Sequence, residues 1–552
     1  MQALEAAAPL TDRGFRFISE AGEEDFCSYQ HLVSEVDRYG GGLQACGLRR
    51  GDRVALVLTE NRDFIFCLLG ALRAGLVPVP IYPPAGLRRV DAYLENTLHI
   101  VRKSQARVLV TDGRADRWIG GAPLGATTLE RVLTVDDLRS SVAPLTPALV
   151  TLDDTCFLQF TSGSTARPKG VIVTYRNLAA NVRAFMEDGL HITRDDSGVS
   201  WLPLYHDMGL IGFVFGPLYH QGTVTYLSPL AFLKRPHRWL QTITRFHATV
   251  SFAPNFAYSL CTHRLREEDL HSLDLSSWRA AGCGAEPVHA ATLAAFAARF
   301  REVGFDERAW LPCYGMAEAT LAISFAPLGR GVRADQVDLE QLARSGRACP
   351  ASTGPTLEIV SCGPPFAEHE VRVFDPTDRE CSRSLGERCV GELCVRGPSV
   401  TSGYFADSES TARATAGGWL HTGDLGYLAD GEVFVCGRSK ELIIVRGRNY
   451  FPQDLERWAA RCEGARPGGI VAFASRGAED QDRVVLVVET KLAPGVARTR
   501  LATEVRRAVH EGTGLAVDEV VVLGPGALPK TSSGKLRRTE VRRRFEAGVL
   551  GQ

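Results

Sequence analysis

The chain has 552 residues, of which 45% are hydrophobic and 23% are charged, and 63 lysines and arginines against 64 aspartates and glutamates leave a net charge of −1. This length favours two or more domains, and this composition excludes a disordered or fibrous protein. The near-neutral charge argues against a general nucleic-acid binder, which usually carries a basic surface.

The sequence lacks the marks of a membrane or secreted protein. Its longest apolar stretch near the start, residues 64–72, is too short to cross a bilayer, and the first residues lack the apolar run of a signal peptide. The 14 cysteines occur without a CxxC pair, and the closest group, Cys381, Cys389 and Cys394, fits no common zinc-site spacing. We therefore expect a cytoplasmic protein with reduced, structural thiols.

The first 150 residues alternate between helical and strand patterns. Apolar residues at helical spacing, followed by glycine, predict helices over residues 28–47 and 61–75. Short apolar runs at 52–60 and 106–112 predict buried strands. This alternation favours an α/β architecture with parallel strands and crossover helices.

The pattern changes further along the chain. Strand-and-helix steps continue as far as an alanine-rich helix at 288–300, and the less regular residues 328–362 look like an insertion. After about residue 438 the pattern is that of a small α/β unit. Between these regions, short strands separated by turn residues predict a β-rich subdomain, with strands at 370–375, 391–397, 431–437 and 441–447.

The sharpest local signal is TCFLQFTSGSTARPKG at residues 155–170. An apolar strand leads into a loop whose backbone N–H groups, hydroxyls and lysine are the donors that a phosphate chain needs. The loop is not a Walker A motif, because the GxxxxGK[ST] spacing is absent and Pro168 interrupts the chain where that motif would open a helix. The candidate phosphate ligands are Thr161, Ser162, Gly163, Ser164, Thr165 and Lys169.

Two further segments, GCGAEP at 282–287 and LPCYGMAEAT at 311–320, have the pattern of strand-to-loop turns. Such turns lie at the carboxyl edge of a parallel sheet, where open α/β sheets bind nucleotides. Tyr314 is suited to stack on a base and Glu318 to hold Mg²⁺ on phosphates. A packed tyrosine and a surface glutamate would fit the same pattern.

The remaining candidates are isolated polar residues in distinctive surroundings. His206 stands beside Asp207 in an apolar segment, a pairing that is more often structural than catalytic. Asp424, in a glycine-flanked turn, suits a carboxylate that accepts ribose hydroxyls. Lys535 follows a Gly/Ser loop, where a lysine is either solvated or able to swing over an anionic site.

In this order the motifs TSGSTARPKG, YGMAE, TGD, GRSK and PKTSSGK resemble those of the adenylate-forming (AMP-binding, acyl-activating) superfamily, over about residues 10–545. Within it, the sequence is more similar to fatty acyl-AMP ligases. This closer resemblance is carried by the start RGFRFI…FCSYQHL, by WLPLYHDMGLIGFVFGPL, by residues 232–260 and 437–456, and by the insertion at 328–362.

The resemblance implies an α/β fold divided into two domains. Residues 1–437 are expected to form a large N-terminal adenylate-forming, acyl-CoA synthetase-like domain of layered βα units plus a β-rich subdomain, with the insertion at about 328–362. Residues 438–552 are expected to form a small mobile α/β lid domain that carries the catalytic lysine, Lys535.

The implied reaction is the ATP- and Mg²⁺-dependent activation of a medium- or long-chain fatty acid to an acyl-adenylate, with release of pyrophosphate. Because charge builds up on a phosphorus centre between two anions, positive charge and oriented donors must lower most of the barrier. By resemblance, Lys535 bridges the substrate carboxylate and the α-phosphate, Glu318 binds magnesium, and His206 is a wall of the acyl entrance.

The resemblance also assigns the nucleotide contacts. Thr161 to Thr165 with Lys169 correspond to the β/γ-phosphate loop, and Asp424 with Arg438 to the ribose clamp, while Lys440 corresponds to the hinge. The adenine slot and its flank comprise Gly284, Ala285, Glu286, Pro287, Tyr314, Gly315, Met316 and Ala317.

In the family's second step the acyl group passes to the phosphopantetheine thiol of an acyl carrier protein, which here would be a separate protein because the sequence contains no GxDS carrier motif. The main alternative is a long-chain fatty acyl-CoA ligase with CoA as acceptor. A catalytically silent or luciferase-like relative is disfavoured because Lys535, Glu318 and Asp424 are intact.

Two expectations concern the substrates. Aromatic residues within 232–260 are expected to line the acyl tunnel, namely Phe232, Trp239, Phe252 and Phe256. A basic cluster near the C-terminus either docks an acidic carrier protein or is a solvated helix face, and comprises Arg537, Arg538, Arg542, Arg543 and Arg544.

Overall fold

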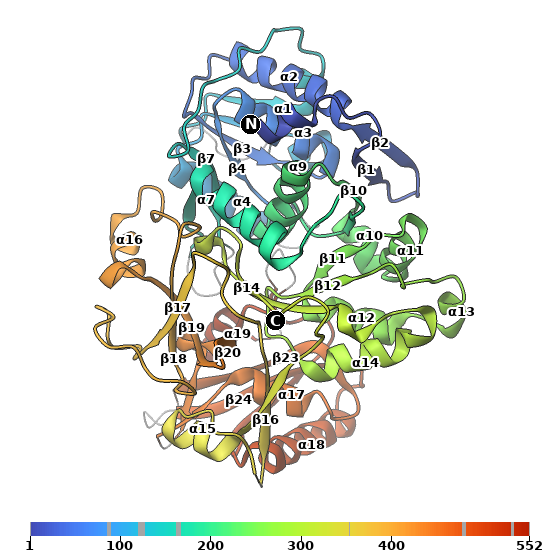
Figure 1. Cartoon of the computed structure of the whole chain (residues 1–552). Coiled ribbons are helices and arrows are strands. Elements are labelled where there is room, and N and C mark those ends of the chain that lie inside the picture. The colour runs from blue at the N-terminus through green and yellow to red at the C-terminus, as the bar shows by residue number, and fades with distance from the viewer. Residues whose placement is uncertain are drawn as a thin grey trace.

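The computed structural model describes residues 2–84, 90–119, 127–161, 167–352, 354–445, 447–476, 482–530 and 535–550. Its central sheet has the order β14–β13–β12–β11–β9–β10–β1–β2, parallel except for the antiparallel pairs β13–β14 and β1–β2 at the edges (Figure 1). The strands are β1 (Gly14–Ile18), β2 (Glu24–Ser28), β9 (Ser197–Ser200), β10 (Thr223–Leu227), β11 (Val250–Ala253), β12 (Ala280–Cys283), β13 (Trp310–Gly315) and β14 (Ala322–Phe325).

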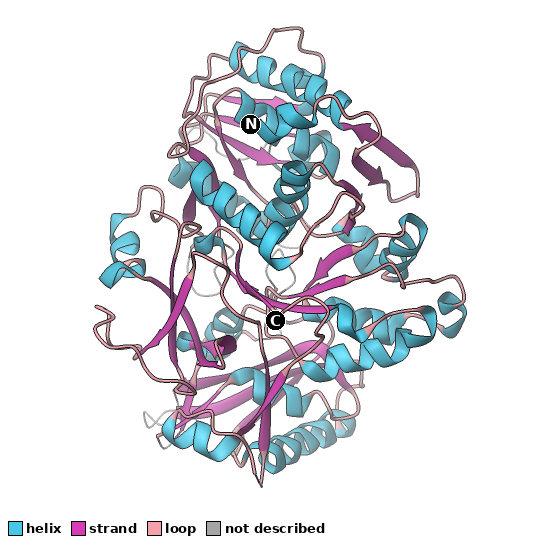
Figure 2. Ribbon diagram, in the orientation of Figure 1, coloured by secondary structure: helices cyan, strands magenta, loops and turns pink. Residues whose placement is uncertain are grey.

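The segments around these strands are mainly helical, as the ribbon in Figure 2 shows. None of the described helices combines the length and apolar character that a membrane crossing needs. The helices are α1 (Gln2–Ala7), α7 (Tyr175–Arg183), η2 (Ala184–Gly189), α8 (Asp207–Leu210), η3 (Ile211–Phe215), α9 (Gly216–His220), α10 (Pro229–Lys234), α11 (His237–Phe246), α12 (Asn255–Arg264), α13 (Glu267–Leu270), α14 (Ala290–Phe300), η4 (Arg301–Val303), η5 (Glu307–Ala309) and η6 (Ala317–Ala319).

A second sheet, of order β4–β3–β5–β6, is parallel throughout and confirms the predicted alternation of strands and helices. The predicted helix at 28–47 is α2, which begins where Ser28 accepts the backbone N–H of His31 as an N-cap. The elements are α2 (Tyr29–Ala45), β3 (Arg53–Val57), α3 (Asn61–Arg73), β4 (Val77–Pro80), α4 (Val90–Ser104), β5 (Val108–Thr111), α5 (Gly113–Ile119), β6 (Arg131–Thr134) and α6 (Val135–Arg139).

Helices α2 and α3 approach closely because glycine occupies their contact. A Cβ atom at Gly40 would stand 2.8 Å from the carbonyl oxygen of Gly70, and one at Gly41 would stand 2.1 Å from that of Ala143. Neither distance allows a side chain. The glycine run inside α2 therefore serves packing, although glycine lowers intrinsic helix propensity.

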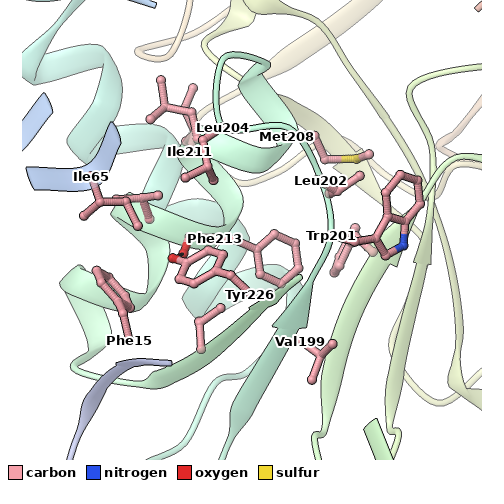
Figure 3. Packing of buried hydrophobic residues seen from close by; sticks show 14 of the residues in the cluster. Phe15, Ile65, Val199, Trp201, Leu202, Leu204, Met208, Ile211, Phe213 and Tyr226 are labelled. Carbon is pink, nitrogen blue, oxygen red and sulfur yellow. Dashed lines mark hydrogen bonds between the residues drawn. The ribbon is translucent and has the colours of Figure 1, made fainter. Parts of the chain in front are cut away.

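The largest hydrophobic core lies around β1, β9 and β10 (Figure 3). The rings of Phe15 and Tyr226 meet edge to face at 5.5 Å, and the Tyr226 hydroxyl donates a hydrogen bond to the carbonyl oxygen of Phe213 at 2.5 Å. Trp201, after β9, stacks on Phe232 with ring centroids 3.8 Å apart. This packing rigidly supports the segment after β9, which carries His206 and Asp207.

The β-rich region is an antiparallel sheet of order β17–β18–β19–β20, in agreement with the sequence pattern except at 441–447. That run instead contains β21, which pairs with β22 outside this sheet. The elements are β17 (Glu370–Phe374), β18 (Gly391–Arg396), α16 (Ser408–Ala414), η7 (Ala416–Gly418), β19 (Leu420–Ala429), β20 (Glu432–Arg438), η8 (Ser439–Glu441), β21 (Ile443–Val445) and β22 (Arg448–Tyr450).

The insertion at 328–362 is more regular than its sequence suggested. It forms the antiparallel pair β15 (Ala334–Asp338) and β16 (Thr356–Val360), joined through α15 (Leu339–Ser345). Its Leu342 shares a buried cluster with Tyr427 of β19 and with Phe451, so the insertion packs on the β-rich sheet and beside the start of the last part of the chain.

The last part of the chain builds its own sheet of order β23–β24–β25, with a separate apolar cluster. Here β23 and β24 are antiparallel and β24 and β25 are parallel, in agreement with the small α/β unit read from the sequence. The elements are α17 (Pro452–Ala459), β23 (Ala465–Arg476), β24 (Asp482–Thr490), α18 (Val496–Thr513), β25 (Glu519–Leu523) and α19 (Arg538–Glu546).

A buried carboxylate connects the amino ends of several strands in the central sheet. Asp196, just before β9, accepts hydrogen bonds from the Arg279 guanidinium at 2.7 Å, from the Thr249 hydroxyl at 2.6 Å and from the Thr193 backbone N–H at 2.7 Å. Burial alone would raise the pKa of Asp196, but these donors prevail and lower it to about 2.

Replacing Asp196 with asparagine should destabilise the fold. Asp196→Asn leaves the Arg279 charge without its buried partner, so we expect the free energy of unfolding at pH 7 to fall by about 1–3 kcal/mol. The native carboxylate has a pKa below the unfolded value of 3.8, so its contribution is present above pH 3.8 and is lost as the pH falls toward 2. The difference in the free energy of unfolding between wild type and Asp196→Asn should therefore become smaller in acid.

Urea denaturation at several pH values measures this difference. The control is Asp195→Asn, which removes an exposed neighbouring carboxylate and should leave the midpoint unchanged. Equal stability of Asp196→Asn and wild type at neutral pH would contradict the assigned role.

Candidate active site

Three loops of the candidate site follow parallel strands of the central sheet. The segment with His206 follows β9, Gly284 to Pro287 follow β12, and Met316 to Glu318 follow β13. Because the carboxyl ends of parallel strands meet at one edge, these segments, far apart in the sequence, share one side of the sheet.

Close backbone packing explains two of the glycines in these loops. A Cβ atom at Gly315 would stand 1.9 Å from the carbonyl oxygen of Leu321, and one at Gly284 would stand 2.4 Å from the sulfur of Cys313. Ala285 and Thr320 have positive φ angles of 65° and 68°, which are uncommon for residues with side chains. The segments between β12, β13 and β14 are thus held in tight turns, the kind of strained backbone that occurs at binding sites.

The predicted phosphate loop joins β7 (Thr155–Phe160) to β8 (Gly170–Thr174). Its base is closed where the Thr161 N–H donates to the carbonyl oxygen of Lys169 at 3.0 Å. Four predicted ligands lie outside the described residues: Ser162, Gly163, Ser164 and Thr165. The Lys169 ammonium lies 4.8 Å from the centre of the Tyr404 ring.

Tyr404 connects this loop to Glu318. Its hydroxyl donates a hydrogen bond to Glu318 Oε1 at 2.8 Å. Burial raises the pKa of Glu318, and the hydrogen bond from Tyr404 acts in the opposite direction. The sequence analysis did not select Tyr404, because the tyrosine lies 86 residues from Glu318 and its motif, SGYF, carries no charge.

Asp424 joins the central sheet to the β-rich region. It is 5% exposed, and its carboxylate accepts a hydrogen bond from the Tyr314 hydroxyl at 2.8 Å and pairs with Arg438 Nε at 2.7 Å. Burial raises the pKa of Asp424, and the Arg438 charge opposes this. Tyr314 therefore uses its hydroxyl to hold Asp424, and its ring is almost completely buried.

A second group of charges contains the lysine from the end of the chain. His206 Nδ1 lies 2.5 Å from Asp207 Oδ1. Burial lowers the pKa of the Lys535 ammonium, while the carboxylates of Asp207, Glu286 and Asp424 raise it. Burial would raise the pKa of Asp207, but His206 and Lys535 lower it overall.

Glu286 was predicted for the adenine slot, and the geometry gives it further partners. Its carboxylate accepts the backbone N–H of Phe256 at 2.7 Å, and Lys535 is among the cations that act on it. Pro287 is exposed, whereas Ala317 is buried and Met316 is half-buried. Lys535 and Glu286 thus share one anionic region with Asp207 and Asp424, although 249 positions separate the lysine from the glutamate (535 − 286).

The predicted hinge residue Lys440 is exposed in the turn η8, directly after β20. The neighbouring Glu441 forms an ion pair with Arg538 of α19, which also pairs with Glu456 of α17 at 2.7 Å. The residues that flank Lys440 therefore connect the end of the β-rich sheet to the helices of the last unit.

An apolar pocket begins beside the charged residues. Met208, Gly212 and Phe213 line it together with Leu321, and it extends to Ser197 at the amino end of β9. Of the aromatic residues expected to form the tunnel, Phe252 lines this pocket. The other three do not: Phe232 and Trp239 are completely buried in the aromatic core, and Phe256 packs against Trp201.

Comparison with known families accounts for most of the chain. Residues 7–405 match the family described as "AMP-binding enzyme". Residues 440–551 match "Disco-interacting protein 2-like, AMP domain". The two matched regions are separated in the sequence by β19 and β20, which carry Asp424 and Arg438.

Individual relatives cover nearly the whole chain. A putative acyl-CoA synthetase of Caulobacter vibrioides is 40% identical, over 100% of this chain and 96% of its own length. JamA of Moorena producens, a medium-chain-fatty-acid–[acyl-carrier-protein] ligase, is 35% identical over 98% of this chain and 93% of its own. A solved structure from work on fatty acyl-adenylate ligases of E. coli and L. pneumophila superimposes with a TM-score of 0.93 at 36% identity, over 99% of this chain and 97% of that one.

Proposed function

Because this chain belongs to the AMP-binding enzymes and, within them, to the fatty acyl-AMP ligases, we propose that it activates a medium- or long-chain fatty acid. The acid and ATP form an acyl-adenylate and pyrophosphate. The acyl group then passes to the phosphopantetheine thiol of a separate acyl carrier protein.

One observation carries the proposal: the segment 206–213 contributes some residues to the charged cluster and others to the lining of the apolar pocket. Asp207 interacts electrostatically with Lys535, while Met208, Gly212 and Phe213 line the pocket. An aliphatic chain in the pocket would leave its carboxylate beside the lysine. A fatty acid has this combination of an apolar tail and one terminal anion.

In the first step, a carboxylate oxygen of the acid attacks the α-phosphorus of ATP, and the bond from that phosphorus to the bridging oxygen breaks to release pyrophosphate. Lys535 would neutralise the approaching anions, which otherwise repel one another. Thr161 and Lys169, with the loop between them, would hold the departing phosphates. Tyr314 would flank the adenine, and Asp424 with Arg438 would hold the ribose.

Magnesium is the metal that this proposal includes, with Glu318 as its protein ligand. Among the described residues, no lysine or arginine forms a salt bridge with Glu318, and its carboxylate accepts a hydrogen bond from the Tyr404 hydroxyl. A carboxylate that is not paired with a lysine or arginine is a suitable ligand for Mg²⁺. The bound ion would supply positive charge to the phosphate oxygens.

The proposed division of the chain places residues 1–437 in the acyl- and nucleotide-binding domain and residues 438–552 in the lid. Lys440 would act as the hinge, because it is exposed and lies between β20 and β21. Rotation there would withdraw Lys535 after adenylation and open a path for the carrier thiol. Glu441, Glu456 and Arg538 all follow Lys440, so their ion pairs would move together with the lid.

The carrier protein is supported by the relative JamA, whose name gives an acyl carrier protein as acceptor. The C-terminal arginines give the proposed carrier-protein partner less support than their number suggested. Arg538 is buried in its ion pairs, and three others pair with glutamates of their own helix: Arg542 with Glu546, and Arg543 and Arg544 with Glu540. These pairs favour a surface helix stabilised within itself.

A fatty acyl-CoA ligase is the second candidate, because the 40% identical relative is described as a putative acyl-CoA synthetase. Both candidates share the first step and differ only in the acceptor. A panel of fatty acids in a pyrophosphate-release assay tests the first step, and transfer to CoA or to a holo-carrier protein tests the second. Pyrophosphate release without fatty-acid dependence would refute both.

Loss of the lysine should impair adenylation selectively. We expect Lys535→Ala to lower fatty-acid-dependent pyrophosphate exchange by on the order of 10²–10³, the cost of one charge-stabilising donor. The control is Lys491→Ala, which removes an exposed lysine of the same unit. Near-normal exchange in the Lys535 variant, with its fold intact by circular dichroism, would refute the assigned role.

A side chain at Gly212 should shorten the acyl pocket. A Cβ atom there would meet nothing closer than Leu321 Cδ2 at 3.8 Å, so Gly212→Val fits the backbone and projects into the pocket. We expect adenylation of the longest acids to fall about 10-fold or more relative to the shortest, because the valine occupies space that methylene groups need.

The chain-length profile of pyrophosphate release measures this effect. The matched control is Gly113→Val, because Gly113 also has open space around its Cβ position but lies in α5 on the other sheet. An unchanged profile for Gly212→Val would mean that the acyl chain occupies a different pocket.

Removing the helix of the insertion should change the choice of acceptor. Asp338 of β15 stands opposite Thr356 of β16, so an Asn-Gly turn can replace residues 339–355 and keep the strand pair. The deletion removes Leu342 from its contact cluster with Phe451 and should release the lid. We expect more acyl-CoA to form.

The measurement is acyl-CoA formation relative to pyrophosphate release, with the melting temperature as a check on folding. The control replaces only Glu340 by glutamine, which removes the ion pair with Arg448 at 3.9 Å but keeps α15. A folded deletion variant that still rejects CoA would show that the insertion does not restrain the lid.

A further inference from the structure

A cluster of metal-ligating side chains lies outside the proposed active site, in the β-rich sheet. Cys394 of β18 stands directly opposite His421 of β19 in the strand register. Cys381 reaches them from the loop after β17, where it has a positive φ angle of 51°. One ligand atom from each of these three residues lies within 4.8 Å of the others.

We propose that Cys381, Cys394 and His421, together with Glu392, form a structural site for a zinc ion. Glu392 lies two positions before Cys394 in β18, and because side chains alternate along a strand, both project from the same face. Glu392 Oε2 is 3.1 Å from His421 Nδ1. Two thiols, an imidazole and a carboxylate are ligands that zinc accepts in a tetrahedral arrangement.

The distances suit this geometry. Cys394 Sγ lies 3.6 Å from His421 Nδ1, whereas Cys381 Sγ lies 3.6 Å from the other ring nitrogen, Nε2. With Zn–S bonds of about 2.3 Å and Zn–N bonds of about 2.0–2.1 Å, tetrahedral sulfur and nitrogen ligands stand about 3.5 Å apart. The Cys394–Nδ1 pair already has this separation, and a shift of the Cys381 loop toward Nδ1 would bring the second thiol to the same centre.

The orientation of the His421 imidazole indicates which of its two nitrogens would bind the metal. Nδ1 faces Cys394 and Glu392, while Nε2 lies 3.1 Å from the backbone carbonyl oxygen of Arg379. An N–H at Nε2 would donate to that carbonyl and leave Nδ1 for the metal. A ligating histidine usually donates its other N–H to a carbonyl or carboxylate in this way.

The charges also balance. The guanidinium of Arg379 lies 3.2 Å from Glu392 Oε2, and its side chain is 55% exposed, so it has room to move outward when a cation enters. Binding of Zn²⁺ to two thiols releases two protons, and the site with two thiolates, one neutral imidazole and one carboxylate has one net negative charge. Arg379 would then be its counterion.

The surroundings bury the ligands His421 and Glu392 almost completely and place the site in the strand that carries Asp424. The His421 and Glu392 side chains are 3% and 6% exposed, and Cys394 packs in a cluster with Phe374 and Trp419. His421 lies three positions before Asp424 in β19. A bound ion would therefore hold the loop after β17 to the start of the strand that carries Asp424.

The test uses the full-length protein, freed of metal by a chelator under reducing conditions and then titrated with Zn²⁺ or Co²⁺. We expect about one ion per chain, with thiolate-to-cobalt charge-transfer absorption and a higher melting temperature when zinc is present. Cys381→Ser should weaken binding by more than the 10–100-fold typical of losing an outer partner. Glu392→Gln should weaken it as well.

The matched control is Cys389→Ser, a thiol of the same region that lies outside the cluster and should leave binding unchanged. Cys381 lies in a loop and is half-buried, so its loss spares the core, and the melting temperature without metal verifies the fold. The proposal fails if wild type binds no ion at micromolar concentrations, if Cys389→Ser loses the site, or if the cobalt spectrum lacks thiolate bands. A Cys381–Cys394 disulfide in the protein isolated without reductant, found by peptide mass spectrometry, would also overturn it.

Discussion

The buried carboxylate of Asp424 connects the parts of this molecule that would otherwise pack independently. It belongs to β19, accepts the hydroxyl of Tyr314 from the central sheet and pairs with Arg438, the last residue of β20. A buried charge is costly without partners, so the Asp424 carboxylate requires both neighbours to be in place. This requirement fixes the β-rich sheet relative to the loops after β12 and β13, and it fixes the point from which the last part of the chain departs.

The same requirement explains why charges gather at this edge of the sheet. Lys535 is drawn toward three carboxylates, Asp207, Glu286 and Asp424, although burial disfavours its charge. The net charge of −1 for the whole chain conceals this local excess of carboxylates. In the proposed two-step reaction, a change in these charges between the steps would favour withdrawal of the lysine.

The sequence predicted those features whose signal is local, and missed those that depend on distant contacts. Strands such as β3 and helices such as α2 follow from apolar periodicity and capping residues, because both act within one turn or one strand. The lysine and glycines of residues 155–170 likewise form one continuous motif. Tyr404 could not be found in this way, because a single tyrosine in a loop becomes significant only when folding brings it to Glu318.

The errors have the same origin. Phe232 and Trp239 were expected to line the tunnel because they are large and apolar, but the sequence does not indicate whether such a residue faces a cavity or the core. The run at 441–447 has a strand pattern, but its strand β21 pairs with β22 and not with β20, since partner choice depends on the fold of the last unit. The basic cluster of the tail left two interpretations open, which its charge alone could not separate, and the ion pairs of four of its arginines favour the helix face over a docking surface.

The cysteines show this limit most clearly, and they lead back to β19. Spacing along the chain grouped Cys389 with Cys381 and Cys394, whereas the strand register replaces Cys389 with His421. In an antiparallel pair, residues directly opposite one another have Cα atoms only about 4.5–5.5 Å apart, so sheet register can form a ligand set that no linear motif describes. Because His421 and Asp424 share one short strand segment, the order of the β17 loop and the position of the Asp424 carboxylate depend on the same backbone.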